Sequence, residues 1–280
     1  MSAARDNFSG NHFVAHAILA FFSVLALAPI AIIVMNAFKS RDAIFGAPLE
    51  PPTTGTFDLI GFRTVFANGN FDAYFMNSFS VTLVALGGTI LFGSMAAFAL
   101  SEYKFKLNSL TALFFTMGIM VPIRLGTPGI LELMVASGLV NTRTALVLVY
   151  IAQGLPMAIF ILAEYMRTVS DDLKNAGRVD GLSEYVIFFW LVLPLLRPAM
   201  VSVAVFTMIP MWNDLWFPLI LAPGEDTKTL TLGAQAFIGQ DVTDWNSVLA
   251  ALTLSILPVL ALYLVFSKGL IRGITSGAIK

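Results

Sequence analysis

The sequence predicts an all-α membrane protein with six transmembrane helices and a cytoplasmic helix between the fourth and the fifth. Three observations support this fold class. Of the 280 residues, 58% are hydrophobic and only 12% are charged, against about 25% charged residues in a soluble domain. The mean hydropathy is +0.84. Several stretches of about 20 residues, the length that crosses a bilayer core, contain no Asp, Glu, Lys or Arg.

The predicted spans follow these charge-free stretches in chain order. They are residues 13–38, 73–101, 107–125, 144–164, 196–221 and 246–267. The third and fifth stretches are shorter than the others. The apolar part of the first span exceeds the 7–15-residue core of a signal peptide, so we expect it to be retained as a helix. Residues 1–280 are therefore expected to form a single transmembrane domain.

The placement of Lys and Arg predicts the orientation of these spans. With the N-terminus inside the cell, inner segments hold ten basic residues and outer segments hold six. Cytoplasmic loops carry the excess of basic residues in membrane proteins. We therefore expect both termini in the cytoplasm. The segment from Lys39 to Asp72 then lies outside, and its prolines and glycines predict an irregular loop.

Composition and missing motifs narrow the function. The net charge of −1 gives no sign of nucleic-acid binding. The lack of cysteine excludes disulfides and thiolate metal sites. No metal site is predicted. No acidic residue lies near the middle of a predicted span, which disfavours an ion-coupled secondary transporter; because backbone carbonyls can bind sodium, this remains the alternative. No GxxxxGK[ST] motif is present, so another polypeptide would bind any ATP.

The largest inner segment, residues 165–197, has the signals of two short helices. Ser170, followed by two aspartates, predicts a helix start, and Gly181 predicts its end. Ser183 can start a second helix that leads towards Pro194. The first helix has a small apolar face made of Leu173, Ala176 and Gly177. Such a face can dock into a groove on another protein or rest on lipid headgroups, and the residues alone favour neither.

The same segment resembles the EAA loop of permeases in binding-protein-dependent ABC importers. The resemblance is carried by Asp172-Leu173-Lys174-Asn175-Ala176-Gly177-Arg178-Val179-Asp180-Gly181 and by Leu191-Val192-Leu193-Pro194. Gly181 and the Leu-Pro pair have the spacing of the EAA pattern, and Arg-Val-Asp-Gly resembles the ending seen in the carbohydrate-uptake branch. The chain departs from the pattern at Asn175, where the family has Glu, and at Gly177, where it has Ala.

Three further segments resemble the same branch. They are Asn77-Ser78 with Ala96–Ser101, then Trp212-Asn213-Asp214 with Phe217-Pro218-Leu219, and the tail from Gly269 to Lys280. The tail is similar to that of the smaller permease of maltose-type systems. The resemblance covers nearly the whole chain from about Phe13.

The resemblance implies a sugar importer in the bacterial inner membrane. This chain and a second, homologous permease would form the path for a sugar or sugar derivative, which an extracytoplasmic binding protein delivers. Two cytoplasmic ATPase subunits would bind ATP and Mg²⁺, so this chain would hold no cofactor and would not be an enzyme. The residues expected to couple it to an ATPase are Asn175, Ala176, Gly177, Asp180 and Gly181.

A sugar path needs aromatic platforms and amide or hydroxyl partners. The predicted path residues are Asn77 in the second span and Trp212 and Asn213 in the fifth. An equally good reading of Trp212 is an interfacial belt residue.

Overall fold

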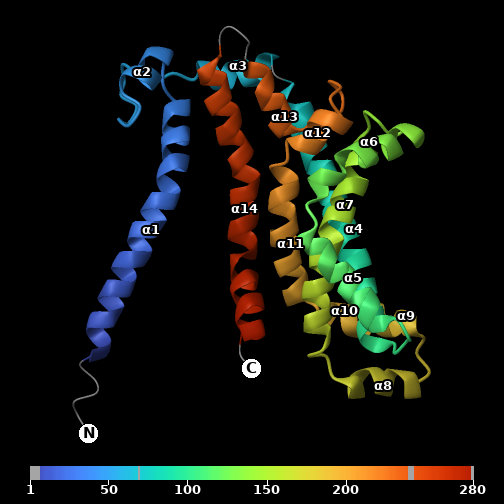
Figure 1. The fold of residues 1–280 in the computed structure, drawn as a ribbon. Helices are drawn as coiled ribbons and strands as arrows, with labels where there is room; N and C mark the ends of the chain where they lie inside the picture. Colours follow the sequence, from blue (N-terminus) through green and yellow to red (C-terminus); the bar gives the residue numbers. More distant parts are fainter. Residues whose placement is uncertain (1–6, 69, 239–242, 279–280) are drawn as a thin grey trace. The chain divides into compact units, whose positions relative to one another are not determined.

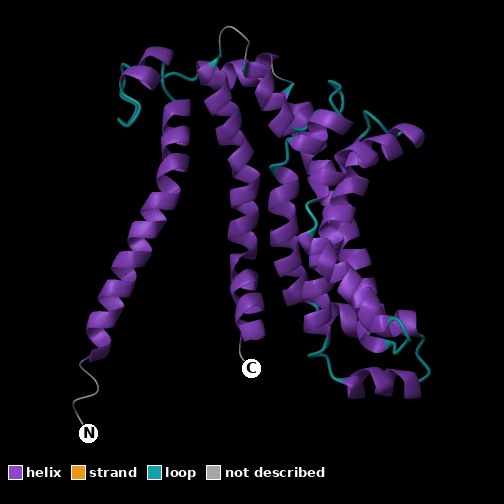
Figure 2. Ribbon diagram, viewed as in Figure 1, coloured by secondary structure: helices purple, strands orange, loops and turns teal. Residues whose placement is uncertain are grey.

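The computed structural model describes residues 7–68, 70–238 and 243–278, and all its regular elements are helical (Figure 2). This confirms the predicted fold class at the level of an all-α chain. Contacts divide the chain into two compact units: Met1–Asn70 with Ala234–Ile256, and Phe71–Gly233 with Leu257–Lys280. The predicted single domain stays a prediction.

The first unit contains α1 (Asn7–Ala37), α2 (Arg41–Gly46), α3 (Ile60–Asn68), η3 (Gln235–Phe237) and the beginning of α14 (Trp245–Ala278). The segment predicted to be an irregular loop holds the two short helices α2 and α3. Lys39 is 1% exposed, and its buried ammonium group donates to Asn36 Oδ1 at 3.0 Å and to the carbonyl of Ala47 at 2.8 Å. Asn246 Nδ2 donates to the carbonyl of Lys39 at 2.8 Å. These bonds fix the end of α1 against the start of α14.

The second unit contains the functional region. Its helices are α4 (Phe71–Glu102), α5 (Asn108–Met120), η1 (Ile123–Gly126), α6 (Thr127–Ala136), α7 (Arg143–Met166), α8 (Asp171–Val179), α9 (Glu184–Val186), η2 (Ile187–Val192), α10 (Leu193–Leu195), α11 (Arg197–Trp212), α12 (Trp216–Leu221), α13 (Leu230–Ala234) and the part of α14 from Leu257. Helices α4, α7 and α11 pack side by side, and α5 packs on α7 (Figure 1).

Small residues let α4 approach α7 closely. A Cβ atom on Gly93 would lie 2.8 Å from Ala158 Cβ, and one on Gly154 would lie 2.7 Å from Thr89 Cγ2. Such short distances show that only glycine fits at these two positions. Small residues at helix crossings are the usual means of close packing between transmembrane helices.

Within the described residues, three helices are long and apolar enough to cross a membrane: Phe13–Ala37, Phe71–Glu102 and Arg143–Met166. The number rises to five if each of two bent helix pairs, Asn108–Met120 with Ile123–Ala136 and Glu184–Leu195 with Arg197–Trp212, is counted as one span. The predicted count of six is not tested by these criteria.

Two predicted spans differ from the helices observed. The helix expected over 107–125 ends at Met120, and the chain bends by 91° before it continues to Ala136. Pro122 explains the break, since proline lacks the N–H that would continue the helix. The span expected over 196–221 is interrupted at residues 213–215. There Asp214 accepts hydrogen bonds from the backbone N–H groups of Trp216 and Phe217, which starts α12 as a separate helix.

Candidate functional site

Helix α8 has the boundaries that the sequence predicts. The Ser170 hydroxyl accepts a hydrogen bond from the N–H of Asp172 at 3.2 Å. At the other end, Gly181 has a φ of +78°. The N–H of Gly181 donates to the carbonyl of Arg178, and the N–H of Leu182 donates to that of Gly177. This is the Schellman arrangement, which needs a left-handed residue after the helix. Ser183 accepts from the N–H of Val186 and so begins the next helical segment.

The second half of the loop belongs to the core. Ile187, Phe188 and Val192 are buried with residues of α4 and α7, and the Phe188 ring lies 5.2 Å from that of Phe98. The loop is therefore packed against the helices, because its residues 187–192 extend the buried core. Helix α8 runs across the ends of the long helices rather than along them (Figure 1).

Gly177 allows α8 to lie directly on this packed segment. It is buried, and a Cβ atom there would approach Leu191 Cδ1 at 3.0 Å and Ile187 Cγ1 at 3.3 Å. The other four predicted coupling residues are exposed: Asn175, Ala176, Asp180 and Gly181. Gly177 thus lies on the face turned towards the chain itself, whereas the remaining four are exposed in this chain.

Four charged residues tie α8 to the end of α4, and we call them the Glu102 cluster: Glu102, Lys174, Arg178 and Glu184. Glu102 accepts from Lys174 Nζ at 2.5 Å and from Arg178 Nη2 at 2.6 Å. Arg178 Nε donates to Glu184 Oε1 at 2.8 Å. Lys174 is only 4% exposed, so its ammonium group depends on Glu102 and on Asp171, 2.7 Å away. A buried charge needs such partners to be tolerated.

Asn175 joins the same network. Its Oδ1 accepts a hydrogen bond from Arg178 Nη1 at 2.9 Å. At the position where the family pattern has Glu, the amide therefore holds the arginine that also binds Glu102 and Glu184.

The predicted path residues lie at the opposite end of α4 and α11. Asn77 is 4% exposed, and its Nδ2 donates to the carbonyls of Asp226 and Lys228. Trp212 is 3% exposed and packs against Tyr74 and Leu230. Asn213 is exposed and donates to the carbonyl of Ile209 at 3.0 Å. In this conformation Asn77 and Trp212 hold the 226–230 segment against α4, so their contact with a sugar stays a prediction.

Asp214 connects three elements near this end. It accepts a hydrogen bond from Tyr150 Oη at 3.1 Å and forms an ion pair with Arg124, whose Nη2 lies 3.3 Å from Asp214 Oδ1. Asp214 itself is 8% exposed, whereas the Arg124 side chain is 65% exposed. The carboxylate thus joins α7 to the two helix breaks, after α5 and after α11.

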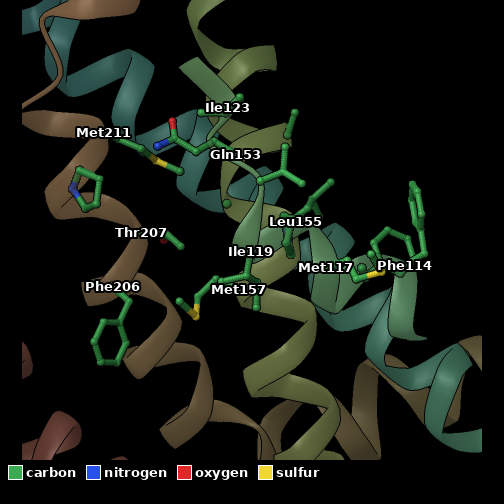
Figure 3. Close-up of a pocket in the computed structure, with 17 residues that line it drawn as sticks. Phe114, Met117, Ile119, Ile123, Gln153, Leu155, Met157, Phe206, Thr207 and Met211 are labelled. Carbon is green, nitrogen blue, oxygen red and sulfur yellow. The ribbon is translucent and has the colours of Figure 1, made fainter. Parts of the chain in front are cut away.

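A cavity of about 840 Å³ lies among α5, α7 and α11. Its lining is mostly apolar and includes the aromatic rings of Phe114, Phe115 and Phe206. Gln153 and Thr207 are the residues with polar side chains among the described lining residues, and Figure 3 shows both between the ribbons of α7 and α11. The volume is within the range of about 300–1,000 Å³ typical of small-molecule sites.

Comparison with known proteins gives a family. Residues 89–279 match the family described as "Binding-protein-dependent transport system inner membrane component". The chain belongs to this family. It is therefore a permease subunit of the inner membrane that crosses the bilayer several times. The resemblance read from the EAA-like loop is confirmed.

Individual relatives agree with this assignment. The permease is 30% identical to the diacetylchitobiose uptake system permease protein NgcG of Streptomyces coelicolor, over 95% of this chain and 88% of the relative. It is 29% identical to the arabinooligosaccharides transport system permease protein AraQ of Halalkalibacterium halodurans, over 93% and 94%. A crystal structure of a bacterial ABC transporter that imports the acidic polysaccharide alginate matches with a TM-score of 0.77 and 20% identity, over 96% of this chain and 98% of that chain. That similarity shows the same fold.

Two features of this permease were not predicted from the sequence. Glu102 directly follows the predicted span 73–101, and basic residues of the inner segment 165–197 were candidates to pair with it. Gln153 was not considered, although it is an amide in the middle of an otherwise apolar span. Intramembrane polar residues are costly and often functional, and that signal was present in the sequence.

One prediction concerns acid sensitivity of the loop. Hydrogen bonds from Arg178, opposed in part by burial, hold the pKa of Glu184 below its ordinary value of 4.5. A carboxyl whose pKa is lower in the folded state stabilises the fold above its unfolded pKa, and this contribution is lost as the pH falls through the folded pKa. We therefore expect α8 to loosen below pH 4.5, measured by hydrogen exchange of the α8 amides in the detergent-solubilised complex. In Glu184→Gln the exchange should already be faster at neutral pH and show a smaller acid step; an unchanged step would contradict the assignment to Glu184.

Proposed function

We propose that this chain is one of two permease subunits of an ATP-driven importer that carries a sugar or sugar derivative. The family description supports a binding protein as the external partner. The named relatives that transport diacetylchitobiose and arabino-oligosaccharides support a carbohydrate as cargo. A second permease and two ATPase subunits complete the proposed assembly, with ATP and Mg²⁺ bound on the ATPases. The predicted alternative, an ion-coupled secondary transporter, finds no support among the relatives.

The proposed topology has six spans, formed by α1, α4, α5, α7, α11 and α14. Helix α8 and both termini lie in the cytoplasm, in agreement with the excess of basic residues on that side. The bends after α5 and before α11 are compatible with spans that continue into helices at the membrane surface. Helices α6 and α12 are then on the external side, where the binding protein would dock.

The observation that carries the coupling role is the Glu102 cluster. A coupling helix must move rigidly with its ATPase and also move the transmembrane helices. The ion pairs from Lys174 and Arg178 to Glu102 join α8 to α4, and the contact of Gly177 with Leu191 joins it to the segment packed on α7. A displacement of α8 is therefore passed to the core of the unit.

The exposed coupling residues form the proposed ATPase contact: Asn175, Ala176, Asp180 and Gly181. On ATP binding the two ATPase subunits approach each other and carry the α8 helices of both permeases with them. Rigid-body movement of this type is a common form of switching, and here it would open the path between the permeases alternately to each side. This chain contributes positioning and movement, while bond breaking takes place on the ATPases.

Gly181→Asp tests the proposed contact. A Cβ atom at Gly181 meets nothing within 4 Å in this chain, so any large effect must come from the partner or from the backbone. The left-handed backbone costs about 1 kcal/mol for a residue with a side chain, and least for Asn and Asp. We expect the complex to assemble but ATP-driven uptake to fall at least tenfold. Gly181→Asn is the matched control with the same backbone cost and no added charge, and it should keep most of the uptake. Normal uptake by the aspartate variant would count against the contact.

The proposed function as a whole is tested by purification. The chain is expressed with the products of neighbouring genes, isolated by affinity and assayed for ATP hydrolysis. We expect a second permease and an ATPase to copurify, and a sugar-loaded binding protein to stimulate hydrolysis. A chain that purifies alone and transports its solute with an ion gradient as the driving force would overturn the proposal.

A further inference from the structure

The cavity among α5, α7 and α11 contains an amide with no partner in the chain. Gln153 lies near the midpoint of α7, and its side chain is exposed. Within the described part of the chain the amide makes no hydrogen bond. An amide without a partner in hydrocarbon costs several kcal/mol. In the membrane it therefore needs water or a polar ligand beside it.

Two prolines add hydrogen-bond acceptors to the same cavity. Pro156 in α7 and Pro210 in α11 both line it, as do the residues four positions earlier, Ala152 and Phe206. Proline has no N–H, so the carbonyl four residues before it loses its helical donor. Two carbonyl groups on facing helices are thus left with free acceptor capacity on the side of the cavity.

Aromatic rings and polar groups together match one type of ligand. A sugar has hydroxyl groups that donate and accept, and apolar C–H faces that pack on aromatic rings such as Phe114 and Phe206. A lipid chain fills apolar space but leaves the Gln153 amide and both carbonyls without partners. A volume of about 840 Å³ is also more than one ring needs, which fits an oligosaccharide.

We propose that this cavity is a sugar-binding subsite of the translocation path and that Gln153 contacts the sugar directly. The inference rests on the proposed import function and adds a site within this subunit. Asn77 and Trp212, whose side chains are occupied inside the chain, would then stabilise the region beyond it. The amide of Gln153 offers both a donor and an acceptor to the hydroxyl groups.

Cysteine accessibility tests the subsite, because the chain contains no cysteine. Gln153→Cys is placed in the complete transporter and treated with a small, hydrophilic, thiol-specific cation, and labelling of this chain is read after its separation from the other subunits. Phe160→Cys is the matched control, since Phe160 is an exposed residue of α7 that does not line the cavity. We expect labelling at position 153 that saturating sugar, together with its binding protein and ATP, reduces. At position 160 we expect either no labelling or labelling that the sugar does not reduce. Absence of labelling in every state, or labelling that sugar leaves unchanged, would overturn the subsite.

Transport kinetics give an independent measurement. Gln153→Leu removes the amide at similar volume, and the loss of one or two hydrogen bonds predicts a three- to tenfold fall in uptake kcat/KM. Gln153→Asn should recover part of it. Unchanged uptake in Gln153→Leu would refute the subsite alone, whereas a wild-type complex without sugar-stimulated hydrolysis would refute the proposed import function.

Discussion

Glu102→Lys is expected to abolish coupled uptake while the transporter still assembles. The substitution replaces the carboxylate that binds both Lys174 and Arg178 with a third positive charge. Lys174 is 4% exposed and cannot turn into water without moving α8. Removal of one partner from a buried ion pair costs about 3 kcal/mol, which is enough to detach α8 from α4. We expect uptake to fall more than tenfold and ATP hydrolysis to lose its response to the loaded binding protein.

A charge exchange separates loss of coupling from loss of folding. Glu102→Lys combined with Lys174→Glu restores one opposite-charge pair, and we expect it to recover a measurable part of the stimulated hydrolysis. The matched control is Glu164→Lys near the end of α7, where the carboxylate is 59% exposed and pairs with Arg167, itself 75% exposed. Such surface pairs contribute at most about 1 kcal/mol, so uptake should change little. Equal defects in Glu102→Lys and Glu164→Lys would remove the special role of the cluster.

The local structure of the loop could be predicted from the sequence because its signals are local. Ser170 caps α8 through its own side chain, and Gly181 ends the helix because the chain needs a left-handed residue there. Neither feature depends on the rest of the fold. The long helices could also be predicted from the sequence, since a charge-free stretch of about 20 residues has few structures open to it in a membrane other than a spanning helix.

The helix breaks were harder to predict because hydropathy does not report backbone geometry. Residues 107–123 contain no charged residue, yet α5 ends at Met120, just before Pro122. In the fifth predicted span the break depends on Asp214, whose carboxylate takes the N–H groups of the next turn and is itself held by Tyr150 from another helix. A local cap and a distant partner together decide this geometry, and only the first is visible in the sequence.

In the candidate sites, too, local features could be predicted from the sequence and contacts between distant residues could not. The exposed residues of α8 could be named from a motif, but the pairing of Lys174 with Glu102 joins positions 72 residues apart and needed the structure. The path residues were chosen for residue type alone. Asn77 and Trp212 have suitable chemistry, but their side chains are engaged within the chain, whereas Gln153 combines suitable chemistry with an open position. Exposure inside the membrane decides between them, and it depends on how α5, α7 and α11 pack.

Gly154→Leu is expected to give the largest loss of stability in the second unit. Gly154 lies where α7 meets both α4 and α11, and a Cβ atom there would approach Thr89 Cγ2 at 2.7 Å and Met211 Cε at 3.2 Å. A larger side chain must push the helices apart, and overpacking of this kind costs about 3 kcal/mol. Separation of α4 from α7 would also expose Thr89, which is 0% exposed. We expect a clear fall in the melting temperature of the detergent-solubilised complex, measured by fluorescence-detected size exclusion after heating, and a lower yield from the membrane.

Gly87→Leu provides the matched control for this prediction. Gly87 lies in α4, and a Cβ atom there meets nothing within 4 Å. Leucine is also a better helix former than glycine, by about 0.8 kcal/mol. The melting temperature should therefore stay the same or rise, although the substitution is identical in chemistry. If both variants melted alike, the close approach of α4, α7 and α11 at Gly154 would not be what stabilises this unit, since the two positions differ mainly in the space around them.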